Sequence, residues 1–216
     1  LKMLQSNTIK PNLYQNSQLP LGELSSDSFE DFVYQSLVLL GEQKKLRMQS
    51  GRQPSGDEGF DCVAKTENSD LVCIQCKRYN NTLYTGTVVE EIIKVALNGV
   101  LDDSTPKYHY IITAEKVSGN LRKQLKQNNY TDLKEECKKL IDGKKLQLTV
   151  INKVKDKSID PYNTVCTYLD SLQDLIVWSG IDFQNELIVI WSKLNDVLEK
   201  HFSLTTVFKE HPRPDF

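Results

Sequence analysis

The chain has 216 residues, of which 39% are hydrophobic and 26% are charged, and its formal net charge is −2. This composition indicates a globular protein with one ordinary domain and an extension, and it excludes a fibrous or intrinsically disordered chain. No segment approaches the ~18 consecutive apolar residues of a membrane-spanning helix, and the N-terminal residues lack the apolar centre of a secretion signal. We therefore expect a cytoplasmic protein with no membrane partner.

The first predicted element is a helix that begins near residue 26. Residues 1–25 are polar, contain two prolines and show no sustained period, so they are expected to form an N-terminal arm. Ser26–Ser28 offer helix caps, and the apolar residues that follow repeat at intervals of three and four. Gly41 is expected to end this helix.

The apolar period then changes from helical to alternating. The segments 45–49, 60–65 and 71–79 alternate, and a loop at 51–59 and a turn at 67–70 separate them, which predicts a meander of three strands. Helical spacing returns in 88–97, and the aromatic and β-branched run 108–113 predicts a further strand. The predicted order is helix, three strands, helix, strand.

The C-terminal part is predicted to be helical. Helices are expected at 119–128 and 132–140, and the segments 160–178 and 182–202 both have helical apolar spacing. We therefore divide the chain into an arm (1–25), an α/β domain (26–150) and a helical extension (151–216). The chain starts with Leu1 and ends on a proline-rich, linker-like stretch, so a further covalently linked domain is expected.

The predicted third strand carries the residues with the clearest chemical potential. Side chains two positions apart in a strand share a face, so Gln75 and Lys77 point the same way, while their neighbours face an apolar layer. If the turn at 67–70 pairs this strand with the previous one, Asp61 lies beside them. A carboxylate, an amide oxygen and an ammonium are then close enough to share an ion.

Other titratable residues have simpler explanations. Gly56–Gly59, which contains two carboxylates, is typical of a turn, and Glu90 and Glu91 begin a helix whose positive end favours acids. Cys73 and Cys76 point to opposite faces of a strand and have no histidine nearby, which argues against zinc. The five scattered cysteines fit a reducing compartment better than a disulfide framework.

The ordered set Asp61 and Gln75-x-Lys77 resembles the PD-(D/E)xK nuclease superfamily. The run from Phe29-Glu-Asp-Phe through Gly-Asp-Glu-Gly-Phe-Asp61 to Gln-Cys-Lys-Arg-Tyr79 resembles, more closely, the Mrr-like restriction endonucleases. The resemblance covers about residues 26–146 and implies an α/β, restriction-endonuclease-like three-layer core (αβββαβ), here followed by the C-terminal helical extension. In this family glutamine often replaces the acidic residue before x-Lys.

The resemblance also implies the roles of the site residues. Asp61 and Gln75 are the implied metal-binding pair, and Lys77 is the implied catalytic lysine. Glu30 is an implied auxiliary residue that assists catalysis as a further ligand of the metal. Together with the backbone carbonyl of Cys76 these are hard oxygen donors, which suit Mg²⁺ or Mn²⁺. Gln75 leaves the ion with one negative charge fewer than an acid would.

DNA is the expected partner, because positive charge is concentrated in the middle of the chain. Residues 107–157 contain 13 Lys or Arg against 6 Asp or Glu, whereas residues 158–216 contain 4 against 9. Contacts to phosphates are typically made by basic side chains and carry little sequence information. The candidates for DNA binding are Arg52, Arg78, Arg122, Lys123 and Lys126.

We thus expect a metal-dependent DNA endonuclease. Since double-strand cleavage by this fold needs two active sites, a homodimer or higher oligomer is expected, with apolar faces of the extension at the interface. The resemblance further implies an effector module of an antiphage defence protein, linked to an NTPase or sensor domain. Two alternatives stay open: a structure-specific or RNA-directed nuclease, and a catalytically silent DNA-binding or assembly domain.

Overall fold

The structure is a computed structural model that describes residues 18–50, 61–143 and 149–202. The whole predicted loop at 51–59, with Arg52, lies outside these ranges, as do residues 1–17 and the linker-like end from residue 203. Predictions for these segments therefore stay predictions.

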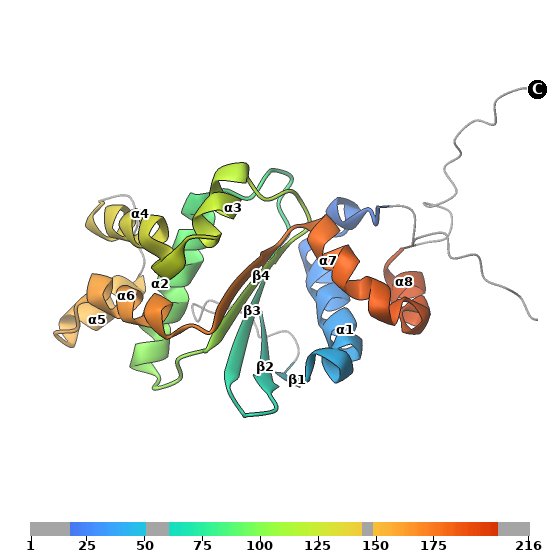
Figure 1. The fold of residues 1–216 in the computed structure, drawn as a ribbon, viewed down its shortest axis with the longest axis horizontal. Helices are drawn as coiled ribbons and strands as arrows, with labels where there is room; N and C mark the ends of the chain where they lie inside the picture. The colour runs from blue at the N-terminus through green and yellow to red at the C-terminus, as the bar shows by residue number, and fades with distance from the viewer. Residues whose placement is uncertain (1–17, 51–60, 144–148, 203–216) are drawn as a thin grey trace, which may run out of the picture.

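A five-stranded mixed sheet lies at the centre of the protein (Figure 1). Its strands, in chain order and in sheet order, are β1 (Leu46–Ser50), β2 (Cys62–Thr66), β3 (Leu71–Lys77), β4 (Tyr108–Thr113) and β5 (Asp174–Trp178). The first three strands pair antiparallel, and β4 and β5 are added in parallel. The predicted meander and the predicted strand at 108–113 are confirmed.

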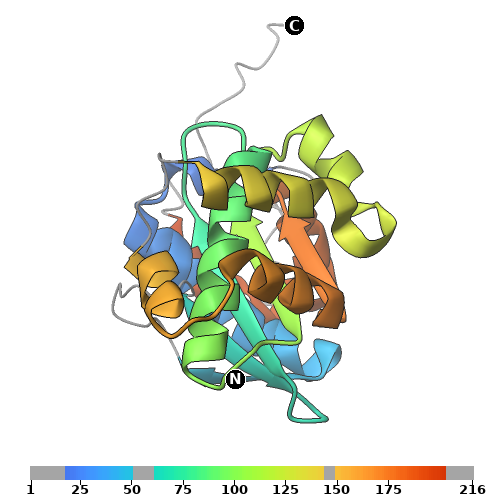
Figure 2. The same ribbon diagram turned by 90° about the vertical axis from the view of Figure 1, so that its left-hand side faces the viewer.

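Helices cover both faces of the sheet, which gives three layers (Figures 1 and 2). One face carries α1 (Ser26–Lys44), α7 (Gly180–Leu187) and α8 (Asn195–His201), with short 3-10 turns at Leu21–Glu23 and Ile188–Lys193. The other face carries α2 (Thr85–Leu101), α3 (Gly119–Leu125), α4 (Thr131–Asp142), α5 (Thr149–Asp156) and α6 (Pro161–Ser171), with a 3-10 turn at Asn128–Tyr130. The expected three-layer α/β architecture is confirmed. No helix in the described ranges has the length and apolarity needed to cross a membrane.

α1 begins where its sequence provides a cap. The side chain of Ser25, one residue before the expected caps, accepts a hydrogen bond from the backbone amide of Ser28. Phe29 and Phe32, one turn apart on the inner face, are both 0% exposed. The apolar stripe read from the sequence is therefore the face that packs against the sheet.

Gly41 lies inside α1, and the expectation that it ends the helix is wrong. The helix continues to Lys44, and Lys45 then adopts a left-handed conformation with φ of 55°. A Cβ added at Gly41 would lie 2.4 Å from the carbonyl oxygen of Leu46. The glycine is needed because the chain folds back closely on α1 when it enters β1.

The residues just before α1 are packed and do not form a loose arm. Leu19, Leu21 and Leu24 are 2%, 2% and 7% exposed and belong to the same core as α1. Arg78, directly after β3, donates from Nε to the carbonyl oxygen of Leu24 at 2.6 Å and also donates to the carbonyl of Gly22. The predicted arm therefore does not extend to residue 25.

The segment Asp174–Trp178 is a strand, and the expectation of a helix there is wrong. α6 ends at Ser171, and β5 pairs in parallel with β4 from Tyr108↔Asp174 to Ile112↔Trp178. The helices before and after β5 have the expected helical spacing of apolar residues, so the short alternating pattern between them is predicted as part of a helix. The helical extension is thus joined to the rest of the protein through the central sheet.

Candidate active site

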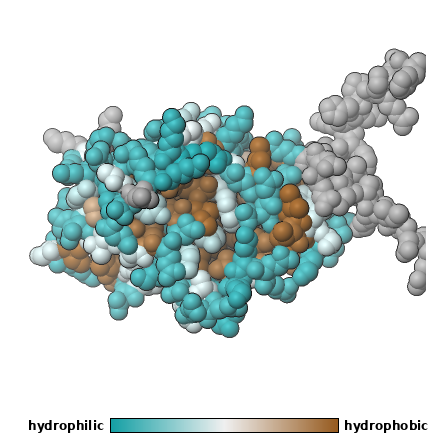
Figure 3. Space-filling view, viewed as in Figure 1, coloured by the Kyte–Doolittle hydropathy of each residue, from teal (hydrophilic) through white to brown (hydrophobic). Residues whose placement is uncertain are grey.

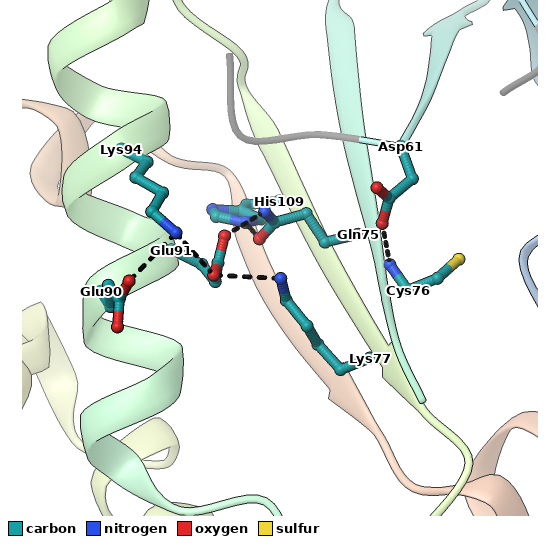
Figure 4. Close-up of polar contacts among 8 residues, drawn as sticks. All are labelled: Asp61, Gln75, Cys76, Lys77, Glu90, Glu91, Lys94 and His109. Carbon is teal, nitrogen blue, oxygen red and sulfur yellow. Dashed lines mark hydrogen bonds and ion pairs between the residues drawn. The ribbon is translucent and has the colours of Figure 1, made fainter. Parts of the chain in front are cut away.

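The two faces of β3 separate apolar residues from chemically active ones, as predicted. Val72 and Ile74 are 0% exposed and belong to the core beneath α1. Gln75 and Lys77 point to the opposite face, toward α2, while the side chain of Cys76 points away from them (Figure 4). The alternation of the strand therefore places the amide and the ammonium together.

Asp61 lies directly before β2, next to the end of β3. Its backbone amide donates to the carbonyl oxygen of Ile74 at 2.9 Å, and its Oδ2 accepts from the backbone amide of Cys76 at 2.6 Å. These two bonds fix the carboxylate beside β3 at the level of the Gln-x-Lys motif (Figure 4). The strand pairing expected from the turn at 67–70 thus places Asp61 beside β3, and the ion that Asp61 is expected to share with Gln75 and Lys77 stays a prediction.

Gln75 is buried and hydrogen-bonded at both ends of its amide. It is 2% exposed; its Nε2 donates to Oε2 of Glu91 at 2.5 Å, and its Oε1 lies 3.2 Å from Nε2 of His109. Nδ1 of His109 lies 3.1 Å from the hydroxyl of Tyr168 on α6. These contacts support an anchoring role for Gln75, and its expected role as a metal ligand stays a prediction.

Lys77 forms an ion pair with a carboxylate of α2. Its Nζ lies 3.0 Å from Oε1 of Glu91, which also pairs with Lys94 at 3.2 Å. Burial alone raises the pKa of the Glu91 carboxyl, but the charge of Lys77, its hydrogen bond and the charge of Lys94 outweigh this effect and hold the pKa below its ordinary value. Glu91 is therefore charged beside the predicted catalytic lysine.

Three predicted site residues act electrostatically on one thiol. Burial raises the pKa of Cys76 well above its ordinary value, and the charges of Asp61 and Glu30 raise it further, whereas the charge of Lys77 lowers it. Burial, Asp61 and Glu30 likewise raise the pKa of Cys62 to about 12. The hydrogen bond to the Cys76 amide holds Asp61 at the end of β3, whereas the side chains of Gln75 and Lys77 extend from the same strand toward α2 (Figure 4).

The oxygen donors expected for a metal ion are of the hard type that a divalent cation such as Mg²⁺ prefers. They are the carboxylates of Asp61 and Glu30 and the backbone carbonyl of Cys76, and of these the structure holds Asp61 in place through the Cys76 amide. Within the part of the chain that the structure describes, no group of three or more His, Cys, Asp or Glu side chains is arranged to hold a metal. Mg²⁺ suits a site with few protein ligands because it keeps several of its waters, whereas structural zinc needs a fuller set of ligands.

The predicted phosphate contacts differ in how their side chains are used. Lys123 and Lys126, at the end of α3, are exposed. Arg122 is bound to Asp182 at 2.6 Å, and the donors of Arg78 go to backbone carbonyls and to Asn80. The lysines are therefore the better placed candidates, and Arg52 lies outside the described residues.

Sequence reasoning missed three members of this site. The sequence predicts only a helix-start acid at Glu91 and no role for His109, yet both contact the Gln75 amide. A usable signal exists for Glu91, because it stands at helical spacing from Val88 and Val95 in an otherwise apolar stripe. No local signal marks His109 or Tyr168, since their contact joins residues 59 positions apart.

A three-layer α/β core with an acid beside a Gln-x-Lys strand defines a restriction-endonuclease-like nuclease. A family model named Mrr_cat and described as restriction endonuclease matches residues 21–150, more than half of the chain, and the chain belongs to this family. It therefore contains a restriction-type nuclease domain. No curated protein and no solved structure matched the chain. The matched region includes Glu30, Asp61, Gln75 and Lys77, whereas Tyr168 lies beyond it.

Proposed function

We propose that this domain is a metal-dependent endonuclease that hydrolyses phosphodiester bonds of DNA. The observation that carries the proposal is the hydrogen bond from the Cys76 amide to Oδ2 of Asp61, which holds this carboxylate beside the strand that bears Gln75 and Lys77. Membership of a restriction endonuclease family supports DNA as the substrate. Acidic oxygens and an ammonium at one place are what phosphodiester hydrolysis requires.

Each residue of the site has a definite task in this proposal. Asp61, Glu30 and the carbonyl of Cys76 would hold Mg²⁺ or Mn²⁺, with Gln75 as a further predicted ligand. The bound ion supplies charge neutralisation at the phosphate and a lower pKa for the attacking water. Lys77 would donate to a phosphate oxygen and orient the water; an ammonium has three donors, so its ion pair with α2 leaves donors for the substrate.

Contacts to the DNA backbone are proposed for the exposed lysines of α3. Lys123 and Lys126 are exposed at the end of that helix, in the part of the sequence with the highest positive charge. Binding through phosphates weakens as the salt concentration rises, because neutralised phosphates release counterions. We therefore expect cleavage with weak sequence preference and a strong dependence on ionic strength.

The active form is proposed to be a homodimer or higher oligomer. Double-strand cleavage needs two such sites, and Ile181, Ile188 and Val189, which follow β5, are 47%, 47% and 60% exposed. In Figure 3 apolar areas on this face lie over the middle of the sheet and over α7 and α8. A monomer in sedimentation velocity, with and without DNA, would contradict this part.

We further propose, from the family, that the chain is the effector module of a larger antiphage defence protein in the cytoplasm.

A plasmid cleavage assay tests the proposed activity. Supercoiled DNA is incubated with wild type, Asp61→Ala and Lys77→Ala, each with Mg²⁺, with Mn²⁺ and with EDTA, and DNA binding is measured in parallel. We expect cleavage by the wild type with either metal, none with EDTA, and none by the two variants although both still bind DNA. Equal cleavage by all three proteins would refute the site.

The same assay separates the alternative functions. Branched DNA and RNA are offered beside linear DNA, so preferential cleavage of one of them would indicate a structure-specific or RNA-directed nuclease. DNA binding without cleavage of any substrate would indicate a silent binding or assembly domain. The reduced negative charge at Gln75 is the feature that favours this second alternative.

A further inference from the structure

Glu91 is an acid in the buried face of an apolar helix. It is 4% exposed, and the buried residues around it on α2 are Val88, Val89, Ile92, Ile93 and Val95. Among the described residues, no other carboxylate is buried to this degree. A buried carboxylate loses the solvation that water gives it, so its position must be compensated by specific partners.

The partners of Glu91 include both side chains of the Gln-x-Lys motif. Oε1 accepts from Lys77 at 3.0 Å and Oε2 accepts from Gln75 at 2.5 Å, so one carboxylate spans the two motif residues (Figure 4). Lys94 lies 3.2 Å from the same Oε1 and 3.0 Å from Glu90. Lys94 thus balances the negative charges on α2 itself, while the other contacts of Glu91 reach across to β3, which bears the predicted catalytic lysine.

Stability alone is a weak reason to keep such a group. Replacing a buried ion pair by apolar residues of similar volume is often neutral or stabilising, whereas removing one partner is costly. α2 already has apolar residues on either side of Glu91, so an apolar pair at 77 and 91 would suit this layer. The contacts of Glu91 are better explained by what they fix, which is the place of the Lys77 ammonium and the orientation of the Gln75 amide.

The charge of Glu91 determines the direction of the hydrogen bonds behind it. A carboxylate only accepts, so Gln75 must turn its NH₂ group toward Glu91 and its oxygen toward His109. His109 must then carry its proton on Nε2, and Nδ1 accepts from the hydroxyl of Tyr168. One buried carboxylate therefore sets a series of contacts from α2 through β3 and β4 to α6.

We propose that Glu91 is the positioning residue of this active site, which holds the Lys77 ammonium in place for the substrate and fixes the Gln75 amide. The role rests on the proposed nuclease activity. In this role Glu91 does not contact the DNA and acts only through Lys77 and Gln75. Misplacing a catalytic group by about 1 Å can cost roughly 100-fold in rate, so losing the tether affects turnover more than DNA binding.

The test compares Glu91→Gln with the matched control Glu90→Gln in the whole chain. Glu90 is the neighbouring residue on α2 and pairs with Lys94, without a contact to the Gln-x-Lys motif among those described. For each protein we measure kcat and KM on plasmid DNA, DNA affinity, melting temperature, and the rate at which an acetylating reagent modifies each lysine, read by mass spectrometry.

We expect Glu91→Gln to lower kcat by roughly 10- to 100-fold with DNA affinity close to wild type, and to lower the melting temperature because the buried Lys77 ammonium loses its charged partner. Acetylation of Lys77 should become several-fold faster, because the ammonium is no longer paired, while lysines far from α2 react as before. Glu90→Gln should keep kcat and the Lys77 rate of the wild type. Glu91→Asp keeps the charge one methylene further back, so it should retain more activity than Glu91→Gln.

The outcomes separate this proposal from the proposed function. If wild type cleaves no nucleic acid, the function fails, yet the acetylation rates still decide whether Glu91 tethers Lys77. If Glu91→Gln behaves like Glu90→Gln in kcat and in Lys77 acetylation, the positioning role is overturned. If Glu91→Gln does not fold, Glu91→Asp decides: wild-type kcat and acetylation overturn the proposal, and reduced kcat with faster Lys77 acetylation supports it.

Discussion

The carboxylate of Asp61 and the backbone amide of Cys76 are joined by a hydrogen bond of 2.6 Å. Asp61 thus has two separable properties: its carboxylate accepts a hydrogen bond from the backbone of β3, and it contributes a negative charge at the end of that strand. An asparagine at this position keeps an acceptor oxygen and loses the charge. An alanine loses both, so comparing the two separates the structural contribution from the chemical one.

We predict that Asp61→Asn abolishes cleavage and leaves the fold intact. The ion would lose a charged ligand, while the amide of Cys76 still finds an oxygen acceptor. Asp61→Ala should abolish cleavage and also lower the free energy of unfolding by about 1–3 kcal/mol, because the Cys76 amide loses its partner. Plasmid cleavage and urea unfolding measure the two effects.

The matched control for Asp61 is Asp70→Asn, on the turn between the same two strands. Asp70 contacts the hydroxyl of Thr66 at 3.4 Å, at the far end of the β2–β3 pair from Asp61. Its change should leave cleavage at the wild-type level. Activity of Asp61→Asn equal to that of Asp70→Asn would show that the charge of Asp61 is dispensable.

Gly41→Ala is predicted to destabilise the protein by about 1–3 kcal/mol, the cost of overpacking. The new Cβ would meet the carbonyl oxygen of Leu46 at 2.4 Å, and this backbone atom belongs to the first residue of β1, directly after the turn from α1. Gly86→Ala in α2 is the control, because a Cβ there meets nothing within 4 Å and alanine favours helices. Urea unfolding should show a lower free energy of unfolding for Gly41→Ala and an unchanged or higher one for Gly86→Ala. Equal changes in the two variants would mean that the backbone at Leu46 can move away from the added methyl group at little cost.

Much of the fold was predictable because its central strands and helices each have a complete local pattern. The alternation at 71–79 and 108–113 and the helical spacing at 88–97 correspond to β3, β4 and α2. β5 has only five residues and begins two residues after the C-cap region of a helix, so its alternation could not be separated from the helical spacing around it. Its strand character depends on pairing with β4, which is a long-range contact.

The candidate site was predictable where residues are close in sequence or share one strand. Gln75 and Lys77 share a face by strand geometry, and the tight β2–β3 turn places Asp61 beside them. Glu91 and His109 reach the same place from other elements, so the sequence offered no spacing rule that joins them to β3. The side-chain partners of the motif thus depended on how the layers pack.

Tyr168→Phe is predicted to lower the free energy of unfolding by about 1–3 kcal/mol, the cost of an unpaired buried polar group. The change removes the hydroxyl that lies 3.1 Å from Nδ1 of His109, a residue with 0% exposure. Tyr162→Phe, six residues earlier on the same helix, is the control and should shift the free energy of unfolding by less than about 0.5 kcal/mol. Thermal melts of both variants decide the matter, and equal stability would contradict a role for the buried hydroxyl.

The stability of the protein should depend on pH above 9 through Cys137 of α4. Burial raises the pKa of this thiol from 9.0 to about 12, with smaller contributions from Cys166 and Glu136. The unfolded chain releases the proton at a lower pH than the folded one, so the contribution is complete below pH 9.0 and is lost as the pH rises toward 12.

The free energy of unfolding of Cys137→Ala should be lower than that of the wild type at neutral pH, and this difference should decrease as the pH increases. With thiols kept reduced, the difference in unfolding free energy should shrink by up to about 1.4 kcal/mol per pH unit above the ordinary thiol pKa. Leu133→Ala, one turn earlier in α4 and equally buried, removes no titrating group, so its difference from the wild type should stay constant. Parallel profiles for the two variants in urea unfolding between pH 7 and pH 10 would mean that the Cys137 thiol ionises as easily in the folded protein as in the unfolded chain, and the close packing of α4 against α2 would not then isolate it from water.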